Sequence, residues 1–331
     1  MEYRQIGTSD IQLSAIAYGA FAIGGTMWGG NDKKDSIAAV HASLDNGVTT
    51  LDTAPFYGFG LSEDMIGEAL AGRDRSAVQL LTKFGLVWDG DGRGEYFFDA
   101  EKDGQTVPVY RLASADSLVR ELENSLRRLR TDYIDLLQLH WPDGTTPIEE
   151  TMTALDRLLR DGKIRAAGVS NYNVDQLSEA RQTLAIASDQ VSYSMLNRSI
   201  EDELVPYALE NKVGIIAYSP MERGLLTGSY FRNARLKADD HRNGYFAQFD
   251  LAFVKNLLDA LQPIADRKGA TLAQLVLRWT SLQPGITSVL AGARNAEQAA
   301  SNARAAEITL SPEELTYIGA LLDSETASVR Y

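Results

Sequence analysis

Asp52, Lys83 and His140 each end a run of apolar and β-branched residues, which is the pattern of a buried strand. Tyr57 comes five residues after Asp52, in the loop that leaves the first of these strands. If the strands are parallel members of a barrel, their carboxyl ends open onto one face, where active sites are built. We therefore expect a carboxylate, an ammonium, an imidazole and a phenol to meet in a site that moves protons.

The residue types predict a role for each side chain in this site. A buried Lys83 ammonium is costly without a partner, and Asp52 is the natural one. A cation beside Tyr57 favours the phenolate, so we expect the pKa of Tyr57 to fall from about 10 towards neutrality. Such a tyrosine can act as a general acid or base, and a neutral His140 could polarise a carbonyl oxygen. The alternatives are a purely structural ion pair and a histidine that only packs in the core.

Short β-rich runs alternate with segments of helical periodicity along the whole chain. The alternation predicts an α/β protein with a single (β/α)8 TIM barrel, preceded by a β-hairpin over 1–13 and followed by extra C-terminal helices. No break in composition divides the chain, so we expect one domain over 1–331. The expected strands are 15–18, 49–52, 78–83, 134–140, 164–170, 190–193, 214–218 and 288–291. The expected helices are 34–45, 62–70, 115–129, 148–160, 174–183, 203–211, 252–268, 272–282, 296–306 and 312–322.

Two connections, about 85–112 and 219–250, are too long to be plain loops. Both follow a predicted strand, so both lie on the carboxyl face, and both are rich in aromatic residues. They are expected to be lid-like loops that line a substrate pocket. The alternative is that they only cover the barrel.

Composition excludes several classes of protein. A formal net charge of −13 and a pI of about 4.8 disfavour nucleic acid and anionic membranes as partners. The absence of cysteine excludes disulfides and thiolate metal sites. The histidines are not at metal-ligand spacing, so we expect no metal. No stretch resembles a signal peptide or a membrane span of roughly 20 apolar residues, which favours a cytoplasmic location.

Several segments together resemble the aldo-keto reductase family over nearly the whole chain, in the bacterial branch related to general stress and sugar-metabolism reductases. They are Leu51-Asp52-Thr53-Ala54-Pro55-Phe56-Tyr57-Gly58, Ser62-Glu63, Ile66-Gly67, Thr82-Lys83, Asp132 to His140 and Gly168-Val169-Ser170-Asn171-Tyr172. The resemblance implies that Tyr57 is the general acid for carbonyl reduction. It also implies that Lys83 and Asp52 tune Tyr57 and that His140 orients the carbonyl oxygen.

The resemblance further implies a nicotinamide cofactor, NADPH/NADP+, with NADH as the alternative. The implied cofactor positions are Ser170, Asn171 and Gln190 at the carboxamide, Tyr218 stacked on the nicotinamide, Ser219, Pro220, Arg223, Gly224, Leu225 and Gly228 along the pyrophosphate, and Gly292, Arg294, Gln298 and Asn302 at the adenosine 2′-phosphate and adenine. A helix start favours an anion there, and the Arg294 fork can grip a phosphate. Other branches carry a lysine at the start of the last segment and an arginine at position 298. This chain lacks both, which keeps NADH open.

Four aromatic residues, Trp28, Phe59, Trp88 and Trp141, are expected to line the substrate pocket, with ordinary packing as the alternative. The predicted function is NADPH-dependent, reversible reduction of an aldehyde or ketone to the alcohol. The partner is therefore a small-molecule carbonyl or alcohol; self-association is compatible with the sequence, which shows no specific signal for it. One alternative is a Schiff-base aldolase or lyase that uses Lys83. Another is a non-catalytic cofactor-sensing subunit of the same fold, as found in potassium channels.

Overall fold

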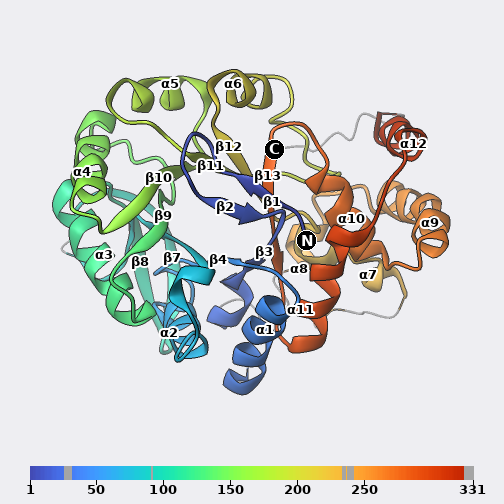
Figure 1. Ribbon diagram of the computed structural model, residues 1–331, viewed down its shortest axis with the longest axis horizontal. Coiled ribbons are helices and arrows are strands. Elements are labelled where there is room, and N and C mark those ends of the chain that lie inside the picture. Colours follow the sequence, from blue (N-terminus) through green and yellow to red (C-terminus); the bar gives the residue numbers. More distant parts are fainter. Residues whose placement is uncertain (26–31, 91, 233–235, 237–241, 324–331) are drawn as a thin grey trace.

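Eight parallel strands close into a barrel at the centre of the molecule (Figure 1). The computed structural model describes residues 1–25, 32–90, 92–232, 236 and 242–323, so Trp28 lies outside the described residues. The barrel strands are β3 (Ile16–Gly19), β4 (Thr50–Asp52), β5 (Gln79–Phe84), β9 (Ile134–Leu139), β10 (Ile164–Ser170), β11 (Ser188–Ser192), β12 (Gly214–Tyr218) and β13 (Ile286–Gly292). They follow one another round the barrel in chain order, and β13 closes it by pairing with β3. The predicted (β/α)8 barrel is confirmed.

Helices surround the barrel and extend beyond it near the end of the chain (Figure 1). They are α1 (Lys33–Asp45), α2 (Leu61–Ala69), α3 (Ala115–Leu129), α4 (Ile148–Arg160), α5 (Val174–Thr183), α6 (Leu204–Asn211), α9 (Leu251–Arg267), α10 (Leu272–Ser281), α11 (Ala296–Ala303) and α12 (Pro312–Asp323), with the short 3-10 helices η1 (Ala20–Gly24), η2 (Arg75–Ala77) and η4 (Arg304–Glu307). Within the described ranges, none of these helices combines the length and the apolar character needed to cross a membrane.

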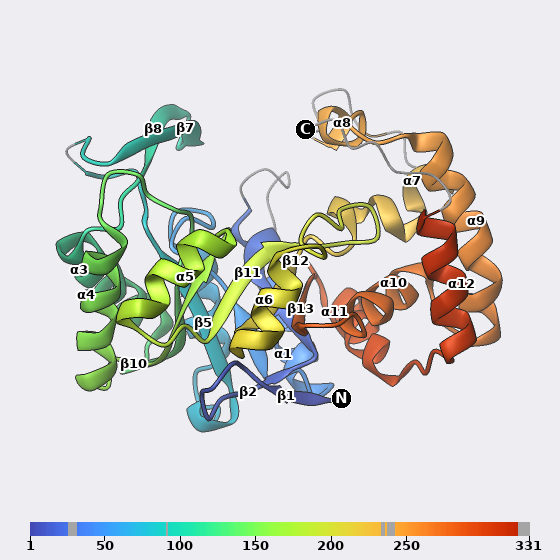
Figure 2. The same cartoon turned by 90° about the horizontal axis from the view of Figure 1, so that it is seen from above.

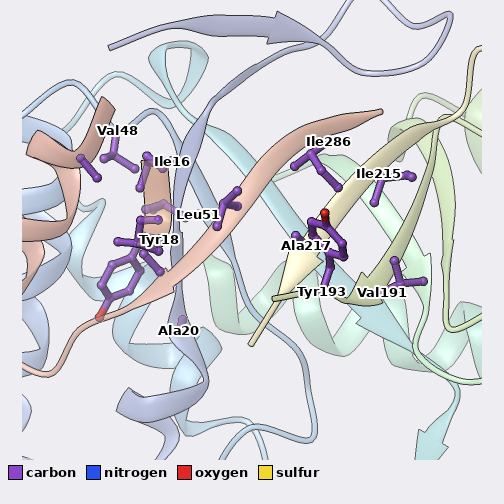
Figure 3. Close-up of a cluster of buried hydrophobic side chains, with 14 of the residues drawn as sticks. Ile16, Tyr18, Ala20, Val48, Leu51, Val191, Tyr193, Ile215, Ala217 and Ile286 are labelled. Carbon is purple, nitrogen blue, oxygen red and sulfur yellow. The ribbon is translucent and has the colours of Figure 1, made fainter. Parts of the chain in front are cut away.

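The main core lies between the strands and the helices. Because side chains alternate across a strand, residues such as Ile16, Leu51 and Ile215 belong to one buried cluster with helix residues such as Val40 and Leu118. Figure 3 shows part of this cluster, with Tyr18 and Tyr193 among the aliphatic side chains. This layer fixes the strands and leaves their alternate residues facing the barrel interior.

An apolar floor closes the barrel interior. The N-terminal hairpin, β1 (Tyr3–Gln5) and β2 (Gln12–Ser14), contributes Ile6, Ile11 and Leu13 to a second buried cluster with strand residues such as Leu81 and Leu136. The predicted hairpin is therefore found, and Figure 2 shows it on the side of the barrel opposite β7, β8 and α8.

The interior changes from apolar to polar towards the carboxyl ends of the strands. On β5, Leu81 belongs to the apolar floor and Lys83, two residues later, does not. On β9, Leu136 gives way in the same manner to Gln138, which pairs with Lys83 across the two strands. Two-residue alternation places these polar side chains inside the barrel. The sequence therefore builds a polar layer directly above a dry floor.

The first insertion, residues 85–112, is an antiparallel sheet and not a loop. Its strands are β6 (Leu86–Val87), β7 (Glu95–Lys102) and β8 (Gln105–Arg111), in the order β6-β8-β7. Asp103 and Gly104 turn the chain with φ of 52° and 76°, the left-handed pair that a type I′ hairpin turn requires. The sequence analysis missed this sheet.

The second insertion, residues 219–250, consists of short helical pieces in its described part. These are η3 (Glu222–Thr227), α7 (Ser229–Arg232) and α8 (Arg242–Phe246). Like β7 and β8, α8 lies on the side of the barrel opposite the hairpin (Figure 2). The lid role expected for both insertions remains a prediction.

Candidate active site

Asp52 and Lys83 form a buried ion pair at the carboxyl ends of β4 and β5. The Lys83 Nζ donates to Asp52 Oδ1 at 2.7 Å and to the Thr53 carbonyl at 2.9 Å, and both charged side chains are 1% exposed. Burial alone would lower the pKa of Lys83, but the charges of Asp52 and Tyr57 and their hydrogen bonds outweigh it and raise the pKa. Lys83 therefore stays a cation, held by a carboxylate that is sealed from solvent.

Tyr57 lies directly beside this pair. The Lys83 Nζ is 4.9 Å from the centre of the Tyr57 ring, and the ring packs edge-on against His140 at 5.7 Å and Phe21 at 4.9 Å. Tyr57 and His140 are partly exposed, in contrast to Asp52 and Lys83. The phenol and the imidazole are thus the two groups of the four that a substrate could reach.

The pKa of Tyr57 does not move in the direction that the sequence analysis expected. Burial raises it above its ordinary value of 10, and the charge of Asp52 raises it further. The Lys83 ammonium lowers it through its charge and a hydrogen bond, but not enough to reverse the effect of burial. The expectation of a pKa near neutrality was therefore wrong, because the depth of burial cannot be read from the spacing of residues.

A close backbone contact positions the loop that carries Tyr57. Gly58 has φ of 66°, and a Cβ placed there would come within 2.1 Å of the Gly24 carbonyl oxygen in η1. A Cβ on Gly24 would in turn lie 2.7 Å from the Tyr57 carbonyl carbon. Two glycines are therefore needed for η1 to press against the loop, and this contact fixes the backbone of Tyr57.

His140 follows the last residue of β9 and is held by its backbone. Its N–H donates to the Phe84 carbonyl at 2.9 Å, and its carbonyl accepts from Asn171 Nδ2 at 3.2 Å. Burial lowers the pKa of His140 well below 6.5, and the Lys83 charge lowers it further. The imidazole is neutral at neutral pH, as a hydrogen-bond donor to a carbonyl oxygen would need to be.

The three residues expected at the carboxamide and Tyr218, expected to stack on the nicotinamide, meet beside the four ionisable residues of the site. Ser170 Oγ and the Asn171 N–H both donate to the Gln190 carbonyl, at 2.7 and 3.0 Å. Tyr218 donates its hydroxyl hydrogen bond to Asn171 Oδ1 at 2.9 Å. Asn171 is held with φ of 63°, an uncommon conformation that is found at functional sites. An amide, a hydroxyl and an aromatic ring therefore converge near Tyr57.

The segment expected along a pyrophosphate follows Tyr218 directly. Ser219, Arg223 and Gly224 have φ of 56°, 52° and 96°, and Gly228 ends η3 with φ of 73°. A Cβ at Gly224 would meet no atom within 4 Å, so its backbone is open to an approaching group. Pro220 and Leu225 are buried beneath this turn.

The expected adenosine segment forms a self-supporting turn after β13. Gln298 Oε1 accepts from the Arg294 N–H at 3.0 Å, and Asn302 Nδ2 donates to the Gly292 carbonyl at 3.0 Å. Arg294 is exposed and makes no ion pair within the described part of the chain. A free guanidinium at a helix start suits an anionic group. Together with the carboxamide residues and the open turn at Gly224, this donor set fits a nicotinamide cofactor.

Three of the four aromatic residues expected at the substrate pocket belong to one connected cluster. Trp88 packs edge-on against Phe59 at 5.3 Å, and Trp141 lies 5.3 Å from Phe97 on β7. The other ring contacts that connect the cluster are Phe56–Phe59, Phe56–Trp88, Phe56–Phe98 and Phe97–Phe98. Phe56 and Phe59 belong to the same loop as Tyr57, so this cluster, called the aromatic wall, includes part of the loop that carries the phenol.

Sequence reasoning missed three buried polar residues around the site. Gln138 lies inside the barrel near Asp52, and Glu222 accepts hydrogen bonds from Ser194 and Tyr245. Asp189 is fully buried, and among the described residues neither of its oxygens has a hydrogen-bond partner of good geometry. Burial raises the pKa of Asp189 to about 8. A polar residue flanked by apolar ones on a predicted strand was the one signal available for Gln138.

Comparison with known proteins gives consistent matches over the whole chain. A model of the aldo/keto reductase family matches residues 15–323. The aldo-keto reductase YhdN of Bacillus subtilis (strain 168) is 39% identical over 98% of this chain and 94% of its own. The NADH-specific methylglyoxal reductase of Escherichia coli (strain K12) is 36% identical over 94% of this chain and 95% of its own. The structure of the glycerol dehydrogenase AKR11B4 from Gluconobacter oxydans superposes with a TM-score of 0.86 at 35% identity, covering 98% of this chain and 96% of that one.

Proposed function

Because this chain belongs to the aldo/keto reductase family, we propose that it catalyses reversible, NADPH-dependent reduction of an aldehyde or ketone to the alcohol, with Tyr57 as the proton donor. The observation that carries the proposal is the placement of a partly exposed phenol beside a buried, paired ammonium. Relatives named for methylglyoxal and glycerol make small aldehydes and polyols the first substrates to test.

Four side chains of this chain handle the proton, and a bound nicotinamide supplies the hydride. Tyr57 keeps its proton at neutral pH because burial raises its pKa, so it can give that proton to the carbonyl oxygen. The phenolate that remains is stabilised by the Lys83 ammonium. In the direction of alcohol oxidation, the same phenolate is the base that takes the proton back.

His140 positions the oxygen that receives this proton. Its ring lies 5.7 Å from that of Tyr57, so one carbonyl oxygen could contact both. Because its pKa is lowered well below 6.5, His140 offers a neutral N–H and does not compete with Tyr57 as the acid. A neutral imidazole serves as an electrophile for a carbonyl in other enzymes.

The Schiff-base alternative is disfavoured by the state of Lys83. A lysine nucleophile needs a lowered pKa and access to the substrate. Lys83 has a raised pKa, is 1% exposed and is held by Asp52. We infer that it is an electrostatic partner of Tyr57 and not a nucleophile.

For the cofactor we favour NADPH, because Arg294 offers an unpaired cation to a 2′-phosphate. One relative at 36% identity is named as NADH-specific, so both cofactors belong in the first assay. We place the reaction in the cytoplasm, in keeping with a chain that contains no cysteine.

The decisive experiment is Tyr57→Phe. We expect turnover to fall by roughly 10²- to 10⁴-fold, the usual contribution of a general acid, while cofactor binding is kept. Steady-state oxidation of NADPH and of NADH against a panel of aldehydes and ketones measures turnover. Quenching of tryptophan fluorescence by the cofactor measures binding.

Tyr110→Phe is the matched control, since it removes a phenol hydroxyl from the first insertion and should leave turnover unchanged. Near-wild-type turnover of Tyr57→Phe would remove Tyr57 from the mechanism. Tight cofactor binding by the wild type without turnover of any carbonyl would instead favour the cofactor-sensing alternative. Borohydride trapping of a substrate on Lys83 would favour the aldolase.

A further inference from the structure

The second carboxylate oxygen of Asp52 is held by two amides from across the barrel. Asp52 Oδ1 accepts from Lys83, and Oδ2 accepts from Gln190 Nε2 at 2.8 Å and from Gln138 Nε2 at 3.4 Å. Gln138 and Gln190 are 0% and 2% exposed. The charge of Asp52 is thus shared between one ammonium and two amide donors in a dry environment, where such bonds are strong.

The orientation of the Gln138 amide is fixed by its surroundings. Its Oε1 accepts from Ser188 Oγ and from Gln190 Nε2, both at 3.4 Å. Turning the amide over would bring its oxygen against the Asp52 carboxylate and its NH2 group against the Ser188 hydroxyl and the Gln190 amide. The Gln138 and Ser188 side chains also fill the space beside Gly168, because a Cβ at Gly168 would come within 3.0 Å of Gln138 Cγ and 2.3 Å of Ser188 Oγ.

We propose that Gln138 is a positioning residue that holds the Asp52 carboxylate, and through it the Lys83 ammonium, in place beside Tyr57. The inference rests on the proposed function, in which Tyr57 exchanges the proton. Gln138 lies below the mouth and is fully buried, so it acts only through its neighbours, Asp52 and Gln190. Gln138 lies in a segment that carries the family resemblance, but it is not among the residues to which that resemblance gives a role.

Gln190 gives this network a link to the cofactor. The side chain that we propose to bind the carboxamide is also the stronger amide donor to Asp52. Its Nε2 also donates to Gln138 Oε1 at 3.4 Å. Gln138 therefore supports Asp52 both directly and through Gln190.

The consequence is measurable at Tyr57. Without the Gln138 donor, the charge of Asp52 is less compensated, and a less compensated carboxylate near a phenol disfavours the phenolate. We expect Gln138→Leu to raise the pKa of Tyr57 by about half to one unit. The rise of alcohol oxidation with pH, which follows formation of the Tyr57 phenolate, should shift to higher pH by the same amount, with kcat about 3- to 10-fold lower at neutral pH and KM nearly unchanged.

The titration of Tyr57 can be read without turnover, as the ultraviolet difference between a protein and its Tyr57→Phe counterpart across pH. Gln138→Met, which keeps the length of the side chain but has no donor, is the second variant if Gln138→Leu does not fold. Ser288→Ala is the matched control, because it removes another buried hydrogen bond of the barrel, to the Ser14 carbonyl at 2.8 Å, away from Asp52. It should not move the titration.

An unshifted Tyr57 titration in folded Gln138→Leu or Gln138→Met would overturn the proposal, whether or not the wild type reduces carbonyls. A shifted titration supports it even if no carbonyl is turned over, in which case the proposed function fails and the positioning role stands. If Tyr57→Phe abolishes turnover but neither Gln138 variant shifts the titration, the function stands and the positioning role fails.

Discussion

The two insertions on the carboxyl face of the barrel are each held at their base by one buried glutamate, but in different ways. Glu121 on α3 holds the first insertion by the backbone, accepting the Gly85 N–H with Oε1 and Oε2 at 3.2 and 3.0 Å. Glu222 holds the second insertion by side chains, accepting the hydroxyls of Ser194 and Tyr245. The first insertion is thus held through a backbone N–H, whereas the second is held through hydrogen bonds between side chains.

The difference extends through each insertion. The first is a paired antiparallel sheet that docks on the loop after β9, where Glu95 accepts the Gly144 N–H at 3.2 Å. The second has Glu222 and Arg223 in left-handed conformation near its start, with φ of 46° and 52°, and Arg223 stacks over the Tyr245 ring at 4.0 Å. The shape of the aromatic wall therefore depends on strand pairing, while the proposed cofactor segment depends on a few side chains. Backbone strain of this kind is typical of functional segments.

Among the substitutions that test this difference between the two insertions, Glu222→Ala should have the largest effect. It removes the acceptor of two hydroxyls, each worth about 1–3 kcal/mol if left buried and unpaired, and it frees α8 from the cofactor segment. We expect cofactor affinity to fall by about tenfold or more, with KM for the carbonyl substrate unchanged. A fluorescence titration with NADPH measures this.

Tyr245→Phe separates the two contacts of Glu222, since it keeps the ring beneath Arg223 and loses only the hydroxyl. It should weaken cofactor binding by less than Glu222→Ala does. If Glu222→Ala bound the cofactor as tightly as the wild type, the second insertion would not depend on this anchor.

A smaller effect is expected from Glu95→Ala in the first insertion. The change removes a partly exposed ion pair with Arg111 and the contact with Gly144, together worth at most about 1 kcal/mol. KM for bulky carbonyls should rise by up to about fivefold, with kcat and cofactor affinity unchanged, because only the wall loosens. Glu101→Ala on the same sheet is the control; an equal rise in KM there would remove the special role of Glu95.

The smallest effect on activity is expected at the base of the first insertion, where the change appears in the pH dependence of stability. Burial raises the pKa of Glu121 to about 8 from an ordinary value of 4.5, against the opposing Gly85 and Ser117 hydrogen bonds. Between these two values the folded state keeps a proton that the unfolded state has lost, so stability falls as pH rises. Glu121→Gln should flatten this decline by up to about 1.4 kcal/mol per pH unit.

Denaturant unfolding at a series of pH values across that window measures the slope. Asp189, whose pKa burial also raises to about 8, stays in the variant, so the slope is reduced and not abolished. An unchanged slope would mean that Glu121 is charged in the folded state.

The barrel and the meeting of Asp52, Tyr57, Lys83 and His140 were predictable because they depend on local patterns. Apolar runs ending in Asp52 and Lys83 predict both the strands and their carboxyl ends. Parallel pairing then brings these ends to one face of the barrel. The hairpin of β7 and β8 was predictable too, since Asp103-Gly104 between alternating residues is a strong turn signal. It was missed because the aromatic residues around it suggested a loop.

What the sequence could not reveal depends on contacts between distant positions. Gln138 and Gln190 meet Asp52 across 86 and 138 residues, and no spacing rule links them. The prediction that the pKa of Tyr57 falls was wrong for the same reason, because the depth of burial is set by the whole barrel. Asp189 resembles any polar residue on a strand, because its full burial also depends on residues distant in the sequence.

The closure of the barrel by β13 has a consequence for how the site comes into being. The four ionisable residues all lie on the first half of the chain, but the Tyr18 hydroxyl bonds the Ala293 carbonyl 275 positions later. Contacts of such long range form slowly and leave edge strands exposed until they do. During synthesis, Asp52, Lys83, Tyr57 and His140 are therefore all present long before the interior that surrounds them. The last strand of the barrel, which carries none of them, decides when the site exists.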